Sequence, residues 1–247
     1  MKASFPSCRA LALVLVIAPA ILAAQTKAPE PPSGLLEYHE VLTGGAIAAD
    51  TLPLIVTIHG LGDRPQRFGD EVRDLPFKSR VILPQAPTEY YKGFSWYVSH
   101  RHTKDPQVRL DSIRESAARL VRLIEHLART RPTAGKPLVT GFSQGGLMSF
   151  VIAAQYPDLV GKSIPIAGDL PREFVPAKAH KGKALPVIRA LHGGQDPVFK
   201  ASVTTRRVED LKRLGYDAAI QVFPKTRHSV PAAMRKVWHR LLGTSGD

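Results

Sequence analysis

The stretch LVTGFSQGG, residues 138–146, decides the fold. Its first three residues are typical of a short buried strand, and a helical pattern follows over residues 145–155. Between them stands the pentapeptide Gly-Phe-Ser-Gln-Gly, whose small terminal residues allow a tight strand-to-helix turn. We therefore predict an elbow that exposes the hydroxyl of Ser143 as a nucleophile, with a plain glycine-rich turn as the alternative.

Short apolar runs alternate with helical patterns on both sides of this elbow. Strands are predicted at residues 54–58, 81–83, 138–140, 164–167, 187–191 and 218–223. Helices are predicted at residues 112–129, 145–155, 203–214 and 231–242. Ser112 and Glu115 have the spacing of a capping box at the start of the first helix. Continuous β-branched runs suit parallel strands covered on both faces, so we predict a single-domain α/β fold with a mostly parallel, doubly wound sheet.

Composition and charge exclude several classes of protein. The chain has 247 residues, of which 44% are hydrophobic, and this content excludes intrinsic disorder. A single cysteine, Cys8, excludes a disulfide framework and a cysteine-built zinc site. The net charge of +13 comes from basic residues dispersed along the chain. We therefore expect no nucleic-acid partner, and we keep two interpretations of the charge open: peripheral contact with an anionic membrane surface, and a plain solvated surface.

The first residues have the layout of a secretory signal peptide. Lys2 and Arg9 accompany a basic start, residues 10–22 are apolar, and two alanines end the run at Ala24. The apolar run is shorter than the roughly 20 residues of a membrane-spanning helix. We expect cleavage near Ala24 and export to a periplasm or to the medium, with a retained N-terminal anchor as the alternative. The predicted organisation is a signal peptide, a proline-rich linker and a folded domain: residues 1–24, 25–34 and 35–247.

A serine nucleophile needs a base, and the base needs an orienting acid. In enzymes with such an elbow the chain order is Ser, then Asp or Glu, then His, each after a strand. Asp196 and His228 each follow a predicted strand in that order, so we predict a triad with Ser143. The alternative acid is Asp169, which also follows a strand, and the alternative histidine is His239 in the last helix.

An oxyanion hole requires backbone N–H groups beside the nucleophile. The first is predicted at Gln144, directly after the serine, and the second at Leu61 in the glycine-rich loop HGLGD, residues 59–63. For His59 we favour a structural role in which its ring holds this loop.

We predict no metal and no other cofactor. His100, His102 and Asp105 form a short charged segment that could supply metal ligands. Two or three ligands without a framework are more often part of a solvated loop, and we favour that interpretation.

Six short phrases together resemble the phospholipase/carboxylesterase family, the branch of α/β-hydrolases that contains the acyl-protein thioesterases. They are HGLGD (59–63), LPQAP (83–87), SWY (95–97), GFSQGG (141–146), HGGQDP (192–197) and HS (228–229). The resemblance implies an α/β-hydrolase fold without a large cap, the triad and oxyanion hole named above, and no cofactor. Trp96 falls where the family has a tryptophan near the acyl pocket, and we add Phe142 and Val198 as candidate substrate-binding residues.

The expected function is hydrolysis of carboxylic esters, or of thioesters, with small to medium acyl chains, by an exported serine hydrolase. The substrate is then a small-molecule or lipid ester. Two alternatives stay open. One is a secreted esterase acting on polysaccharide acetyl or feruloyl groups or on polyester, and the other is a non-catalytic binding protein on a hydrolase scaffold.

Overall fold

The computed structural model describes residues 34–99, 102–179, 182 and 184–243. The predicted signal peptide lies outside the described residues, and so does the predicted linker except for its last residue. The limits of the domains stay predictions.

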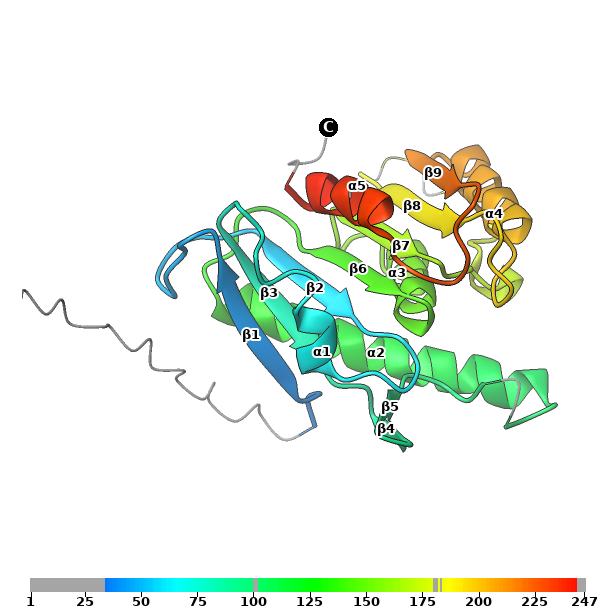
Figure 1. Ribbon diagram of the computed structural model, residues 1–247, viewed down its shortest axis with the longest axis horizontal. Helices are drawn as coiled ribbons and strands as arrows, with labels where there is room; N and C mark the ends of the chain where they lie inside the picture. Colours follow the sequence, from blue (N-terminus) through cyan, green and yellow to red (C-terminus); the bar gives the residue numbers. More distant parts are fainter. Residues whose placement is uncertain (1–33, 100–101, 180–181, 183, 244–247) are drawn as a thin grey trace, which may run out of the picture.

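A seven-stranded sheet forms the centre of the described chain, in the order β1-β3-β2-β6-β7-β8-β9 (Figure 1). Its strands are β1 (Tyr38–Thr43), β2 (Leu54–Ile58), β3 (Ser79–Pro84), β6 (Leu138–Phe142), β7 (Lys162–Ile166), β8 (Val187–Gly193) and β9 (Ala218–Phe223). Strand β1 runs antiparallel to β3, and the other neighbouring pairs are parallel. The predicted mostly parallel sheet is confirmed.

The helices and a small hairpin occupy the connections. They are α1 (Pro65–Gly69), α2 (Pro106–Thr130), α3 (Gln144–Gln155), α4 (Ala201–Arg213) and α5 (Ala232–Gly243), with a 3₁₀ turn η1 (Arg172–Phe174) and a hairpin of β4 (Thr88–Tyr90) and β5 (Gly93–Ser95). Among the described residues the hairpin is a small insertion, and the connections carry no cap domain.

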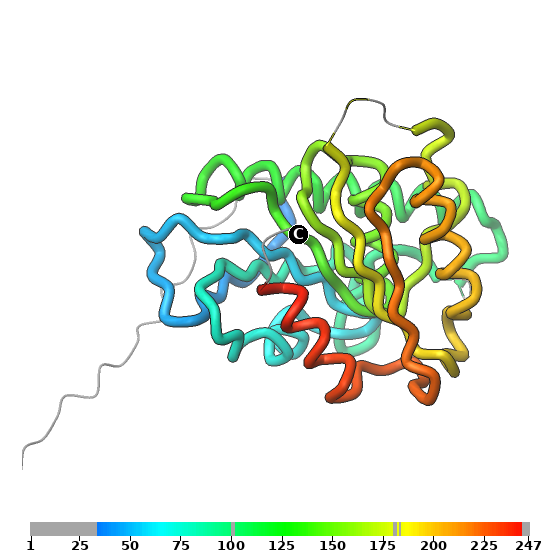
Figure 2. The backbone as a smooth tube through the Cα atoms, turned by 90° about the horizontal axis from the view of Figure 1, so that it is seen from above, coloured from blue at the N-terminus to red at the C-terminus, as the bar shows by residue number. Residues whose placement is uncertain are grey.

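Side chains of the central strands alternate between two cores, as the period of a strand requires. Leu54 and Val56 of β2 join a large cluster with α2, α3 and α4, whereas Ile55 joins a smaller cluster with α1 and α5. Figure 2 shows α4 and α5 on opposite sides of the sheet. This burial on both faces explains why these strands have continuous apolar sequences, and it makes the fold doubly wound.

The predicted start of the long helix is wrong. Helix α2 begins at Pro106, and the carboxylate of Asp105 accepts a hydrogen bond from the N–H of Gln107, 2.8 Å away. Ser112 lies inside the helix, where its hydroxyl donates to the carbonyl of Arg109 at 2.8 Å. Glu115 pairs with an arginine one turn later, so the expected capping box is absent. The first helical turn is exposed and lacks the apolar periodicity that marks the rest of α2.

No helix in the described part of the chain is both long enough and apolar enough to cross a membrane.

Candidate active site

The serine of the pentapeptide stands at a strained turn between β6 and α3. Ser143 has φ 58° and ψ −114°, a backbone conformation that non-glycine residues rarely adopt. The flanking glycines allow it, because a Cβ at Gly141 or Gly145 would approach the carbonyl oxygen of Ile58 to 2.5 Å or 1.9 Å. The neighbouring strand β2 therefore passes directly against the turn, and both glycines are required by close packing.

Ser143, His228 and Asp196 are hydrogen-bonded in series. The Oγ of Ser143 lies 2.9 Å from Nε2 of His228, and Nδ1 of His228 lies 2.7 Å from Oδ2 of Asp196. A carboxylate accepts, so Nδ1 carries the proton and Nε2 accepts from the serine hydroxyl. The three side chains come from the ends of β6, β8 and β9, which meet at the carboxyl edge of the parallel sheet.

The carboxylate of Asp196 is fixed in place by its own loop. Its side chain is fully buried, and Oδ1 accepts from the backbone N–H groups of Val198 at 2.8 Å and Phe199 at 3.0 Å. Because Oδ1 accepts these two bonds, the carboxylate is held with Oδ2 facing Nδ1 of His228.

His192 is a second histidine beside this acid, and sequence reasoning did not single it out. Its Nε2 lies 2.8 Å from the carbonyl oxygen of Phe199 and 3.5 Å from Oδ2 of Asp196. Burial lowers the pKa of His192, which favours a neutral ring that donates from Nε2. The phrase HGGQD, in which it stands four residues before the acid, was the available signal.

Two backbone N–H groups are available next to the serine. Gln144 is the first residue of α3, so its N–H has no acceptor within the helix. The N–H of Leu61 makes no recorded hydrogen bond within the described chain, although its neighbour Gly62 donates to Phe94 at 2.8 Å. Among the described residues, neither predicted donor therefore has a recorded acceptor for its backbone N–H.

Comparison with known proteins assigns this chain to a family. A sequence model of the family described as Phospholipase/Carboxylesterase matches residues 45–242, which is most of the chain. The chain belongs to the phospholipase/carboxylesterase family. It is an esterase-type hydrolase with the α/β-hydrolase fold, as predicted.

Relatives of this family member come from distant organisms. It is 26% identical over 191 residues to "Lysophospholipase-like protein 1" of Mus musculus, covering 71% of this chain and 80% of the relative. It is 24% identical over 183 residues to "Esterase YpfH" of Escherichia coli, and the match covers 72% of this chain and 76% of that relative. The crystal structure of Zea mays acyl-protein thioesterase 2 superimposes with a TM-score of 0.64 at 21% identity, covering 83% of this chain and 97% of that one. At this identity the last similarity shows the fold alone.

The side chain of Gln144 ties α3 to the segment after β5. Its Oε1 accepts from the N–H of Trp96 at 2.9 Å, and its Nε2 donates to the carbonyl of Tyr97 at 3.1 Å. The indole of Trp96 is 1% exposed and donates from Nε1 to the carbonyl of His59 at 2.9 Å. In this family member Trp96 therefore supports the loop that carries Leu61. Sequence reasoning gave Gln144 a backbone role only.

A cavity of about 560 Å³ lies beside this segment, between the β4–β5 hairpin and the first half of α2. Trp96, Tyr97 and the exposed Tyr91 contribute to its wall.

The two other candidate substrate-binding residues lie close to the triad. The ring of Phe142 is half-buried, with its centroid 4.8 Å from that of His228. The side chain of Val198 is 59% exposed, on the loop whose backbone holds Asp196. Both offer apolar surface near the serine, and their role in binding stays a prediction.

The alternative residues do not join the triad. Asp169 makes no recorded contact with His228, and its Oδ1 is buried without a hydrogen-bond partner within the described chain. Nε2 of His239 lies 2.7 Å from the carbonyl of Glu71. The buried ring of His59 uses both nitrogens, to the carbonyl of Gly60 and the N–H of Ala86, which is the structural role expected.

The charged segment considered for a metal is only partly described. His100 lies outside the described residues, and Nδ1 of His102 is 2.7 Å from Oγ of Ser99. In the described segments no three His, Cys, Asp or Glu side chains are grouped as metal ligands.

Proposed function

We propose that this protein hydrolyses carboxylic esters through a Ser-His-Asp acyl-enzyme mechanism. One observation carries the proposal: His228 bridges Ser143 and Asp196 with hydrogen bonds of 2.9 and 2.7 Å. Family membership makes the protein an esterase-type hydrolase, and this arrangement supports how it works.

In the proposed mechanism, Oγ of Ser143 attacks the ester carbonyl carbon while Nε2 of His228 takes the hydroxyl proton. Asp196 holds the imidazole in the required tautomer, and the N–H groups of Leu61 and Gln144 donate to the developing oxyanion. His228 then gives its proton to the leaving alkoxide oxygen, which departs as an alcohol. A water molecule then loses a proton to His228 and attacks the acyl carbon. The bond between that carbon and Oγ of Ser143 breaks, the carboxylic acid leaves, and His228 returns its proton to Oγ.

The same steps apply to a thioester, with a thiol as the leaving group. The proposed acyl chains are small to medium, and the apolar surface of Phe142, beside His228, and of Val198, on the loop that holds Asp196, supports this size.

The test is Ser143→Ala, assayed with a p-nitrophenyl acyl ester. We expect turnover to fall by roughly 10⁴–10⁶-fold, since the nucleophile is lost while the remaining site is kept. Ser202→Ala is the matched control, because Ser202 is exposed on α4 and its hydroxyl makes no recorded hydrogen bond. Retained turnover in Ser143→Ala would refute the mechanism.

A second measurement separates the substrate classes. A series of acyl-chain lengths, as oxygen esters and as thioesters, is compared with acetylated xylan on the same enzyme. We expect the highest kcat/KM with a soluble ester of small to medium chain. A clear preference for the polysaccharide would replace this substrate class by the alternative one.

The composition of residues 1–24 supports export as a further part of the proposal. Cell fractionation and N-terminal sequencing of the purified protein test it. We expect the protein outside the cytoplasm with its N-terminus near residue 25, and an intact first residue in the cytoplasm would contradict export.

A further inference from the structure

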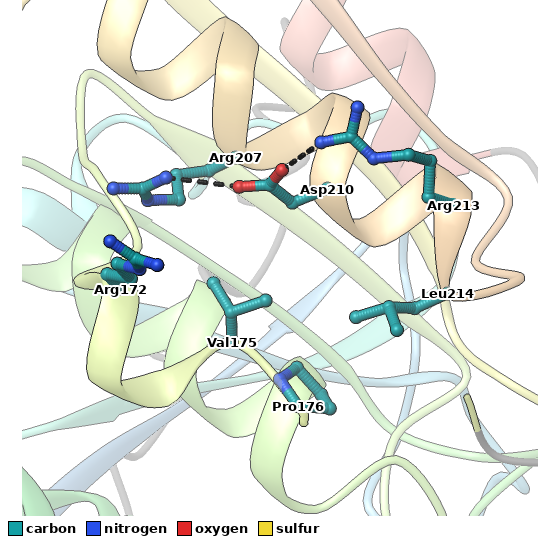
Figure 3. Close-up of a pocket in the computed structure, with 7 residues that line it drawn as sticks. All are labelled: Arg172, Val175, Pro176, Arg207, Asp210, Arg213 and Leu214. Carbon is teal, nitrogen blue, oxygen red and sulfur yellow. Dashed lines mark hydrogen bonds and ion pairs between the residues drawn. The ribbon is translucent and has the colours of Figure 1, made fainter. Parts of the chain in front are cut away.

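A second hollow lies away from the triad, between η1 and α4. Its volume is about 540 Å³, within the range of small-molecule pockets. Figure 3 shows the residues that line it: Arg172, Val175, Pro176, Arg207, Asp210, Arg213 and Leu214. The lining thus combines three guanidinium groups and one carboxylate with an apolar side of valine, proline and leucine.

The carboxylate of Asp210 is shared by two of the arginines. Its Oδ2 accepts from Nη1 of Arg207 at 3.0 Å, and its Oδ1 accepts from Arg213. The two arginines lower the pKa of Asp210, so it stays ionised. With three cations and one anion, the lining carries a net charge of +2.

Several arginine N–H groups in this hollow have no recorded acceptor among the described residues. Arg207 uses Nε for the carbonyl of Leu170 at 3.1 Å and one Nη1 proton for Asp210, which leaves three of its five N–H groups. The guanidinium of Arg172 makes no recorded hydrogen bond or ion pair with the described residues, and only the backbone carbonyl of this residue accepts, from the N–H of Val175 at 3.1 Å. Asp169 also lies within electrostatic reach of Arg207, but among the described residues it makes no recorded hydrogen bond to that guanidinium.

The free guanidinium groups lie at the same end of the hollow. In Figure 3 the guanidinium groups of Arg172 and Arg207 are drawn toward the same end of the hollow, whereas Asp210 lies between Arg207 and Arg213. Two cations repel each other at such a place, and an anion between them would remove the repulsion and accept from both.

We propose that this hollow binds a phosphate monoester, with the phosphate between Arg172 and Arg207 and the organic part against Val175, Pro176 and Leu214. The planar guanidinium groups of Arg172 and Arg207 can each donate two N–H hydrogen bonds to a pair of oxygens. A carboxylate has only two oxygens and can accept such a pair of bonds from one guanidinium group. The three terminal oxygens of a phosphate monoester can accept from both guanidinium groups. The ligand is the headgroup of a lipid or a free small molecule, since both present the same phosphate.

The test measures binding of two probes to the folded protein. Isothermal titration with glycerol 3-phosphate tests the free small molecule, and co-sedimentation with phosphatidylcholine vesicles, with and without phosphatidic acid, tests the lipid headgroup. We expect saturable binding of glycerol 3-phosphate, of the vesicles with phosphatidic acid, or of both. Arg172→Gln should bind at least about tenfold more weakly, because it loses the charged hydrogen bonds of the guanidinium group. Arg172→Lys keeps the positive charge but not the planar guanidinium group, so its affinity is expected to lie between those of the wild type and Arg172→Gln.

Arg206→Gln is the matched control, because Arg206 is exposed on α4 beside Arg207 and does not line the hollow. All variants are expected to keep ester hydrolysis, which shows that they are folded. Val175→Glu places a carboxylate in the hollow and is expected to abolish binding. Absence of saturable binding in both arms overturns the proposal. So does equal weakening by Arg206→Gln and Arg172→Gln, which would indicate only a response to net charge.

Discussion

At the scale of single residues, Asp169 has a half-buried carboxyl group that takes no part in the hydrogen bonds among Ser143, His228 and Asp196. Burial raises its pKa to about 6, although Arg207 and Arg109 oppose the shift. Its Oδ1 finds no hydrogen-bond partner in the described structure. Above its pKa the folded protein therefore holds a poorly solvated charge, while the unfolded chain exposes the same charge to water.

The prediction at this scale is that Asp169→Asn removes a pH dependence of stability. The carboxyl binds its proton more tightly in the folded state, with a pKa of about 6 against 3.8, so its own contribution to the free energy of unfolding falls as the pH rises from about 4 to 6. Relative to the variant, the wild-type free energy of unfolding should drop by about 1–3 kcal/mol over this interval. Urea unfolding at several pH values measures it.

Asp74→Asn is the control, since Asp74 is exposed and should leave the wild-type pH profile unchanged. If the unfolding free energies of wild type and Asp169→Asn changed in parallel with pH, the raised pKa of Asp169 would be contradicted.

At the scale of elements, α2 is the longest helix described, and its first turn depends on one side chain. Asp105 accepts from the N–H of Gln107, while Pro106 at the first helical position needs no acceptor. Ser112, by contrast, connects the helix to the active-site side of the fold, because its hydroxyl accepts from the N–H of Val98 at 3.1 Å.

We predict that Asp105→Ala lowers the free energy of unfolding by about 1 kcal/mol, the usual cost of losing an N-cap. Glu115→Ala should change it by less than about 0.5 kcal/mol, because Glu115 only forms an exposed pair with Arg119. Chemical denaturation of both variants decides where the helix is capped. A larger loss for Glu115→Ala would restore the capping box predicted from sequence.

At the scale of the whole molecule, ion pairs of Glu40 with Arg80 and Arg131 connect the edge strand β1 to β3 and to the end of α2. The side chain of Arg80 on β3 is 1% exposed and donates to Glu40 of β1 and to the carbonyl of Ala48 at 2.8 Å. Glu40 also accepts from Nε of Arg131, directly after α2, at 3.2 Å. Besides the backbone pairing of β1 with β3, the carboxylate of Glu40 therefore links these two strands to the residue that follows α2.

Removing that carboxylate leaves a buried guanidinium without its counter-charge. We predict that Glu40→Ala lowers the free energy of unfolding by about 3 kcal/mol, as expected when one member of a buried pair is lost. The comparison is Asp217→Ala, which breaks the pair with Arg189 at a carboxylate that is 62% exposed and should cost at most about 1 kcal/mol. Equal effects in thermal or urea unfolding would contradict a special role for Glu40.

The sequence by itself determined the central sheet and the order of the candidate triad. Buried parallel strands need apolar side chains on both faces, so each is visible in its own local sequence, and the fully buried β2 has the predicted bounds, residues 54–58. The elbow around Ser143 is likewise local, because its glycines are required within five residues. The predicted positions of Asp196 and His228 followed from the rule that parallel strands end at one edge.

Only the tertiary structure decided the rest. Strand β1 is half-exposed and gains its partner β3 from a segment some 40 residues later, so its local sequence carries no continuous apolar run. The roles of His192 and of the Gln144 side chain depend on backbone groups from other loops. The arginine-lined hollow joins η1 to α4, and its unmatched charge exists only because folding places those side chains together.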